Sequence, residues 1–130
     1  MAPRRESRER ALGLCYEGEV RELDPAAVLA NLPSAPDEYA VRLLEGVDAH
    51  RAEIDAHLTE YSEHWTLDRM PVVDRCILRI AAYELAYEPE IPTAVAITEA
   101  VELAKQYSTK DSGRFVNGLL SRVAAEVRAS

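Results

Sequence analysis

The stretch SGRFVNGLLSRVAAEV, residues 112–127, decides whether this chain is helical or built from hairpins. It contains Asn117-Gly118, and Asn-Gly between apolar residues is the strongest short-range signal for a β-hairpin. The apolar positions, however, follow one face of a helix and do not alternate as in a strand. They are Phe115, Val116, Leu119, Leu120, Val123 and Val127. We therefore predict a helix, in which Gly118 costs roughly 1 kcal/mol relative to alanine.

Two polar or small residues inside this helix need an explanation. We expect Gly118 to be a site of close helix packing, because it carries no side chain. Asn117 lies next to the apolar face, where a side-chain amide needs a hydrogen-bond partner. We expect that partner in another helix or in a ligand, and the residues do not choose between the two.

The same helical spacing runs through the rest of the chain. We predict a first helix from about Arg4 to Glu19, and a short second helix with Asp24 as N-cap and Pro25 in its first turn. Residues 35–62 form one long helix or two joined near Gly46, two helices cover 71–88 and 91–108, and the last begins near Thr109. The core positions of the helix over 91–108 are Val95, Ile97, Ala100, Val101 and Ala104. The prediction is an all-α bundle of about six to seven helices, forming one domain over residues 1–130.

Composition limits the class of protein. Apolar residues make up 48% of the chain, which is too many for a disordered protein. No apolar run approaches the ~20 residues of a membrane span, and the N-terminal MAPRRESRER lacks the apolar segment of a secretory signal. We infer a cytoplasmic protein without a membrane partner. Cys15 and Cys76 fall among apolar helix positions and are interpreted as small buried hydrophobic residues.

The net charge of −8 is unevenly distributed. Residues 1–16 carry a net charge of +2, residues 17–68 carry −10, and residues 69–130 are neutral. A local basic site can bind RNA on a protein that is acidic overall. The charge pattern therefore leaves RNA binding open and places it near the N-terminus.

Neither a metal site nor an enzyme is expected. His50, His57 and His64 are spaced by seven residues, which separates them by ~10.5 Å along a helix. Ligand bonds to a metal are only ~2 Å long, so these histidines cannot share one ion. The sequence contains no H-E-x-x-H, C-x-x-C or glycine-rich phosphate loop, and no Ser, Cys or His in a recognisable nucleophile context. We expect no cofactor.

Basic residues open the first helix. Arg4, Arg5 and Arg8 oppose the helix dipole, and none has a local partner as clear as Glu6 is for Arg10. Tyr16 lies on the same helical face as Arg8. Cations near an aromatic ring suit single-stranded RNA, because the cations bind phosphates and the ring stacks on a base. The structural alternative is a solvated terminus.

A second basic group lies at the start of the last helix. Lys110 and Arg114 again oppose the dipole, whereas Asp111 suits it, and Phe115 follows. Basic charge at two helix starts suggests one shared anionic ligand. In the helix over 71–88, charged residues flank an apolar stripe broad enough for a core helix or for a partner-binding groove. These charged residues are Asp74, Arg75, Arg79 and Glu84.

Four stretches together resemble the NusB family of bacterial transcription antitermination factors. They are RRESRERALGLCY, DRCILRIAAYEL, IPTAVAITEAVELAK and DSGRFVNGLL, which occur in that order between residue 4 and about residue 121. Residues 17–66 match only in helical pattern. The resemblance implies an all-helical, non-enzymatic protein that binds the single-stranded boxA element of nascent ribosomal RNA. It also implies the partner NusE, a small-subunit ribosomal protein, within an antitermination complex on RNA polymerase.

The resemblance also implies site residues. The RNA-binding positions would be Arg4, Arg5, Arg8, Tyr16, Lys110, Asp111, Arg114 and Phe115. Asp74 and the helix that follows, including Arg79 and Glu84, would form the NusE-binding surface. The chain departs from the family at Thr98, where Asn is usual, and at Ser121, where Asp is frequent.

Two functional alternatives remain beside RNA-binding antitermination. The first is a protein-interaction adaptor with little RNA affinity of its own. The second is the RNA-binding appendage of a ribosomal RNA methyltransferase, which we discount because no methyltransferase domain follows in this sequence. The residues are compatible with either a monomer or a homodimer.

Overall fold

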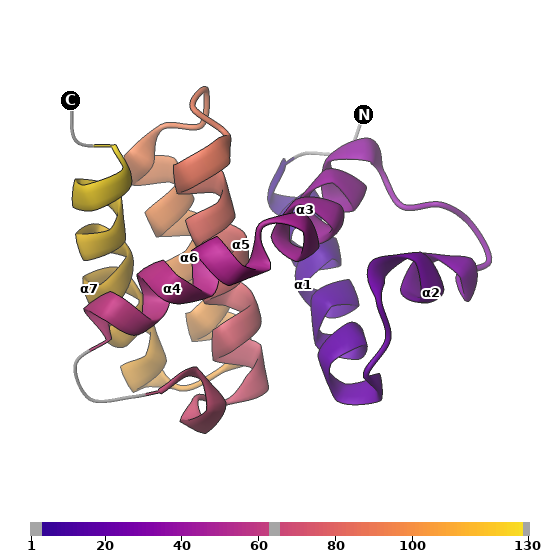
Figure 1. Ribbon diagram of the computed structural model, residues 1–130, viewed down its shortest axis with the longest axis horizontal. Coiled ribbons are helices and arrows are strands. Elements are labelled where there is room, and N and C mark those ends of the chain that lie inside the picture. Colours follow the sequence, from indigo (N-terminus) through magenta and orange to yellow (C-terminus); the bar gives the residue numbers. More distant parts are fainter. Residues whose placement is uncertain (1–3, 63–65, 129–130) are drawn as a thin grey trace.

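A computed structural model describes residues 4–62 and 66–128 of the chain. Within these ranges the fold contains no strand, which confirms the predicted all-α class (Figure 1). The helices are α1 (Arg4–Arg21), α2 (Pro25–Ala30), α3 (Glu38–Ala49), α4 (Arg51–Tyr61), the 3-10 helix η1 (Leu67–Arg69), α5 (Val72–Tyr87), α6 (Thr93–Tyr107) and α7 (Lys110–Val127). No helix in the described ranges is long and apolar enough to cross a membrane.

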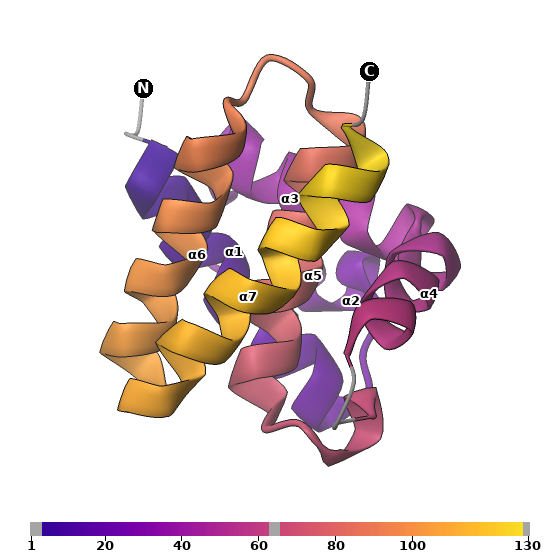
Figure 2. The same ribbon diagram turned by 90° about the vertical axis from the view of Figure 1, so that its left-hand side faces the viewer.

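Helix α5 is the centre of the bundle. It contacts α1, α3, α4, α6 and α7, and every residue from Cys76 to Leu85 is buried. A helix surrounded in this way must be compatible with burial on all sides, which explains the broad apolar stripe in its sequence. Helices α1 to α3 lie on one side of α5, and α6 and α7 pack against each other on another (Figures 1 and 2).

Helix ends are set by local hydrogen bonds. Asp24 caps α2 by accepting from the Ala27 amide at 2.8 Å, with Pro25 at the first position, as predicted. Thr109 caps α7 by accepting from the Ser112 amide at 3.2 Å, which confirms the predicted start of the last helix. The segment over 35–62 forms two helices, but they meet at His50 and not near Gly46.

Gly46, not Gly118, is a site of close packing. A Cβ added to Gly46 would lie 2.4 Å from Cε1 of Tyr83, so the tyrosine ring occupies the space of a side chain. A Cβ added to Gly118 would meet no atom within 4 Å, and the packing prediction for Gly118 is wrong. The reason is helical register: Asn117 and Gly118 both lie on the exposed face of α7. Asn117 is exposed, so its side chain is accessible to a ligand, and a ligand contact by Asn117 stays a prediction.

The core face of α6 differs in part from the prediction. Val95 is 41% exposed, whereas the buried positions are Ala96, Ala100, Leu103 and Ala104. Most residues of this buried face are alanines, so a search for large apolar residues at helical spacing does not predict which face of α6 is buried. Small residues there let α7 pack closely against α6. Thr98 and Ser121, the two departures from the family pattern, are exposed, so neither disturbs the core.

Both cysteines behave as small hydrophobic residues. Cys76 is buried and Cys15 is partly buried, and neither forms a disulfide. Burial raises the pKa of Cys15 to about 12 and that of Cys76 to about 11. Both thiols are therefore protonated and unreactive near neutral pH.

Candidate nucleic-acid interface

The three N-terminal arginines occupy three different environments. Arg8 is buried, with 3% of its surface exposed, and forms a bidentate ion pair with Glu84 of α5. Its Nε and Nη2 donate to the two carboxylate oxygens at 2.9–3.1 Å, and the Tyr39 hydroxyl donates to the same carboxylate. Burial alone would lower the pKa of Arg8, but hydrogen bonding and the charge of Glu84 raise it. Arg8 is thus a structural cation in this arrangement.

Arg4 and Arg5 lie at the surface. The side chain of Arg5 is 65% exposed and pairs with Glu99 of α6 at 3.0 Å. The guanidinium carbon of Arg4 lies 3.9 Å from the centre of the Tyr39 ring, which is cation–π geometry. Neither partner is local in sequence: both come from distant helices, which local spacing does not reveal.

Tyr39 links the buried and exposed arginines. Its hydroxyl is bonded to Glu84 and its ring lies under Arg4. Burial, followed by the hydrogen bond to Glu84, raises the pKa of Tyr39 well above its usual range. The tyrosine therefore remains a neutral hydrogen-bond donor, and its ring is held in place for Arg4. No local pattern in the sequence indicates this role, since Tyr39 is 31 residues beyond Arg8.

Two exposed tyrosines flank a surface groove beside these arginines. Tyr16 is 42% exposed and Tyr107 is 47% exposed, and the groove between them has a volume of about 320 Å³. An adjoining hollow of about 70 Å³ contains Arg5 and Arg8, and Glu9 lines both spaces. The Tyr107 hydroxyl donates to Glu9 at 2.8 Å. We call this continuous surface the α1–α6 strip; it comprises Arg5, Glu9, Leu12, Tyr16, Val73, Glu99 and Tyr107.

The start of α7 presents the second basic group. Lys110, Asp111 and Arg114 are exposed, as an RNA contact requires. Phe115 is only partly exposed, and it packs against the main hydrophobic core. Its ring is thus first a core side chain that is partly exposed.

The charged residues of α5 are buried and paired inside the chain. Arg79 is 6% exposed; it donates to Asp55 at 2.9 and 3.1 Å and to Glu19 at 2.7 Å. Glu84 is 1% exposed and holds Arg8. The structure thus gives Arg79 and Glu84 roles within the fold, where the expectation was an exposed partner-binding surface.

Asp74 differs from the other two charged residues of α5. It is 4% exposed, and its Oδ2 accepts from the Ser112 hydroxyl at 2.9 Å, which ties α5 to the start of α7. Its Oδ1 is buried without a hydrogen-bond partner among the described residues. The adjacent Val73 lines the α1–α6 strip. Asp74 is therefore the member of the predicted partner set that lies next to the α1–α6 strip.

The described histidines do not cluster. His50 stacks on Tyr87 with ring centres 3.8 Å apart, and His57 is partly exposed on α4. His64 lies outside the described residues. Over residues 4–62 and 66–128, no group of three or more His, Cys, Asp or Glu residues is arranged to hold a metal ion.

Comparison with known proteins identifies the family. Residues 5–125 match the NusB family. The chain is 50% identical to the transcription antitermination protein NusB of Acidothermus cellulolyticus, over 96% of this chain and 89% of that protein. NusB of Myxococcus xanthus is 44% identical, over 95% of this chain and 96% of that protein.

Solved structures agree with the sequence comparison. The structure of T. maritima NusB has a TM-score of 0.86 at 39% identity, covering 96% of this chain and 92% of that chain. A structure of the antitermination factors NusB and NusE in complex with double-stranded RNA has a TM-score of 0.80 at 27% identity, covering 93% and 95%. The chain belongs to the NusB family of transcription antitermination proteins.

Proposed function

We propose that this chain binds the single-stranded boxA element of nascent ribosomal RNA together with NusE, within an antitermination complex on RNA polymerase in the cytoplasm. The observation that carries the proposal is the α1–α6 strip. It places an exposed cation, Arg5, and two exposed tyrosines, Tyr16 and Tyr107, along a surface groove, a combination that suits single-stranded RNA. The similarity to a NusB structure solved with NusE and RNA supports the same assignment.

The residues divide into direct and positioning roles. Arg4 and Arg5 bind phosphates; both lie at the surface, and the cation–π contact with Tyr39 holds the Arg4 guanidinium there. Tyr16 stacks on a base, and Lys110 and Arg114 bind further along the strand, with Asp111 and Phe115 beside them. Arg8 acts indirectly, by holding the start of α1 against α5.

NusE binds next to this RNA site in our proposal. A partner docked beside Val73 would adjoin Asp74, whose Oδ1 would gain a donor after a small shift. A basic partner would also offset the repulsion between RNA and a chain of net charge −8. RNA and NusE should therefore bind cooperatively, each raising the affinity of the other by the same factor, commonly about 5- to 150-fold.

The decisive experiment measures boxA RNA affinity at several salt concentrations, with and without saturating NusE. The double variant Arg4→Ala/Arg5→Ala removes two phosphate contacts. It should bind RNA more weakly and flatten the slope of log affinity against log salt by about 1.4, since each phosphate on a single strand contributes about 0.7. Arg10→Ala is the matched control, because Arg10 is an exposed arginine of the same helix.

The outcomes separate the two candidate functions. Equal losses of affinity in the double variant and in Arg10→Ala would show only a general charge effect. RNA affinity that is negligible with and without NusE would favour the adaptor function. For the partner site, Asp74→Asn keeps an acceptor for Ser112 and removes the charge, so it should weaken NusE binding while the fold is retained.

A further inference from the structure

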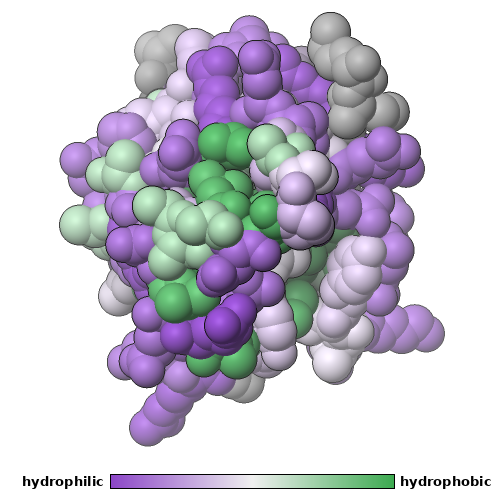
Figure 3. Space-filling view, turned by 90° about the vertical axis from the view of Figure 1, so that its right-hand side faces the viewer, coloured by the Kyte–Doolittle hydropathy of each residue, from purple (hydrophilic) through white to green (hydrophobic). Residues whose placement is uncertain are grey.

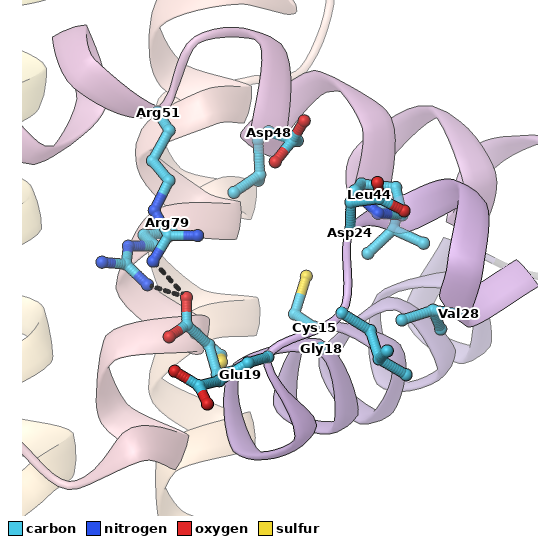
Figure 4. Close-up of a pocket in the computed structure, with 14 residues that line it drawn as sticks. Cys15, Gly18, Glu19, Asp24, Val28, Leu44, Asp48, Arg51 and Arg79 are labelled. Carbon is cyan, nitrogen blue, oxygen red and sulfur yellow. Dashed lines mark hydrogen bonds and ion pairs between the residues drawn. The ribbon is translucent and has the colours of Figure 1, made fainter.

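A concave site separate from the α1–α6 strip is a pocket between α1, α2, α3, α4 and α5. Its volume is about 410 Å³, within the range of ordinary ligand pockets. Apolar side chains from three helices line it, including Cys15 of α1, Val28 of α2, and Leu44 and Val47 of α3. In Figure 4, Val28 and Leu44 lie on one side and the sulfur of Cys15 lies near the middle. The pocket can therefore receive an apolar side chain.

This pocket separates two parts of the hydrophobic core. Leu14, Val28 and Leu44 form a small cluster apart from the main core around α5, and Cys15 packs against both. Helix α2, which forms one wall, contacts only α1 and α3 extensively. The side of the molecule that contains α2 shows an apolar patch surrounded by hydrophilic surface (Figure 3). An apolar group entering here would add a second link, beside Cys15, between the two clusters.

The charges around the pocket favour a cationic occupant. Its two arginines are already neutralised within the chain, because Arg51 and Arg79 both donate to Glu19 (Figure 4). Arg79 is further paired with Asp55. Three more carboxylates line the pocket and are solvent-exposed, namely Glu22, Asp24 and Asp48. The lining thus carries a net negative charge, within the segment of the chain that holds the excess of acid.

The pocket is distinct from the RNA and NusE sites proposed above. The two sites share no lining residue: the pocket is formed by residues of α1 to α5 such as Cys15, Val28 and Arg79, whereas the strip is formed by other residues of α1, by Val73 and by residues of α6. Figure 2 shows α6 and α4 at opposite edges of the molecule. One protein could therefore occupy the pocket while RNA occupies the strip.

We propose that this pocket binds a basic peptide segment of a protein partner, which inserts one aliphatic side chain between α2 and the Cys15 sulfur and places flanking Lys or Arg residues against Glu22, Asp24 and Asp48. The apolar walls provide the anchor, and the carboxylates select positive flanking charge. RNA is disfavoured as an occupant by the same carboxylates.

The test uses three tripeptides titrated into ¹⁵N-labelled full-length protein and followed by NMR. Acetyl-Lys-Leu-Arg-amide should shift the amide signals of Gly18, Val28 and Val47 in a saturable manner. Acetyl-Lys-Gly-Arg-amide lacks the anchor and should bind about ten- to a hundredfold more weakly, since a buried leucine side chain is worth about one to two decades of affinity. Acetyl-Glu-Leu-Glu-amide should give no saturable shifts at the pocket.

A pair of variants on one helix tests the charge argument. Asp48→Lys reverses a charge that lines the pocket and should weaken acetyl-Lys-Leu-Arg-amide roughly three- to tenfold. Glu45→Lys makes the same change on an exposed residue of α3 outside the pocket lining and should have little effect. The proposal is overturned if the acidic peptide binds equally well, if the two variants behave alike, or if the shifts map to the α1–α6 strip. A further control varies the protein concentration in the absence of peptide. If the amide signals at the pocket then shift, the pocket binds a second copy of the chain, and the proposal is also overturned.

Discussion

The ion pair between Arg8 and Glu84 provides the sharpest test of the structural role assigned to Arg8. Only 4% of the Arg8 side chain and 1% of the Glu84 side chain are exposed, so bulk water solvates neither charge. Glu84 accepts three hydrogen-bond contacts from Arg8 and one from Tyr39. Glu84→Ala leaves a buried guanidinium without its carboxylate. Breaking a buried pair in this way costs about 3–5 kcal/mol of unfolding free energy.

The assay is urea unfolding followed by circular dichroism at pH 7. Urea unfolding gives the loss of unfolding free energy directly. In thermal unfolding of a chain of 130 residues, the same loss corresponds to a decrease of roughly 10–20 °C in Tm. Glu102→Ala is the control, because Glu102 is a half-exposed carboxylate of α6 paired with Lys105, and it should cost less than about 1 kcal/mol. The double variant Arg8→Met/Glu84→Leu should be more stable than Glu84→Ala, because it leaves no unpaired charge. A loss below about 1 kcal/mol for Glu84→Ala would refute the reasoning and return Arg8 to the set of candidate phosphate contacts.

Three further predictions concern the fold. Gly118→Ala should raise the unfolding free energy by about 0.5–1 kcal/mol, whereas Gly46→Ala should lower it, because only at Gly46 does a tyrosine ring occupy the Cβ position; urea unfolding of both variants checks this. Asp37 caps α3 and accepts hydrogen bonds from the Ser7 hydroxyl and the Ala40 amide. Burial raises the pKa of Asp37, but these hydrogen bonds outweigh burial, so the pKa is lowered overall. Asp37→Asn should therefore cost stability at pH 7, and the difference from the parent should vanish as pH falls through the lowered pKa, below the usual 3.8. Because burial raises both thiol pKa values, Cys15 and Cys76 should react with Ellman's reagent at pH 8 only after unfolding, as measured by absorbance at 412 nm.

Helical periodicity and capping residues were enough to predict the class of fold. Asp24-Pro25 and Thr109 mark helix starts through bonds to amides only three residues away, so the information is local. The Asn117-Gly118 pair shows the limit of a local signal. Its hairpin preference is overridden because the surrounding apolar residues pack α7 against α6 and α5.

The sequence by itself determined the helices, their caps, the all-α class and, through four matching stretches, the family. Tertiary structure alone decided which charged residues are accessible. Arg8 and Glu84 are separated by 76 residues, and Arg79 is bonded to side chains 24 and 60 residues earlier, so no local pattern distinguishes these cations from Arg4, Arg5 or Lys110. The same holds for Gly46 and for the pocket beneath α2, which exist only where several helices meet. Helix formation depends on neighbours within one or two turns, whereas burial and ion pairing depend on the whole bundle.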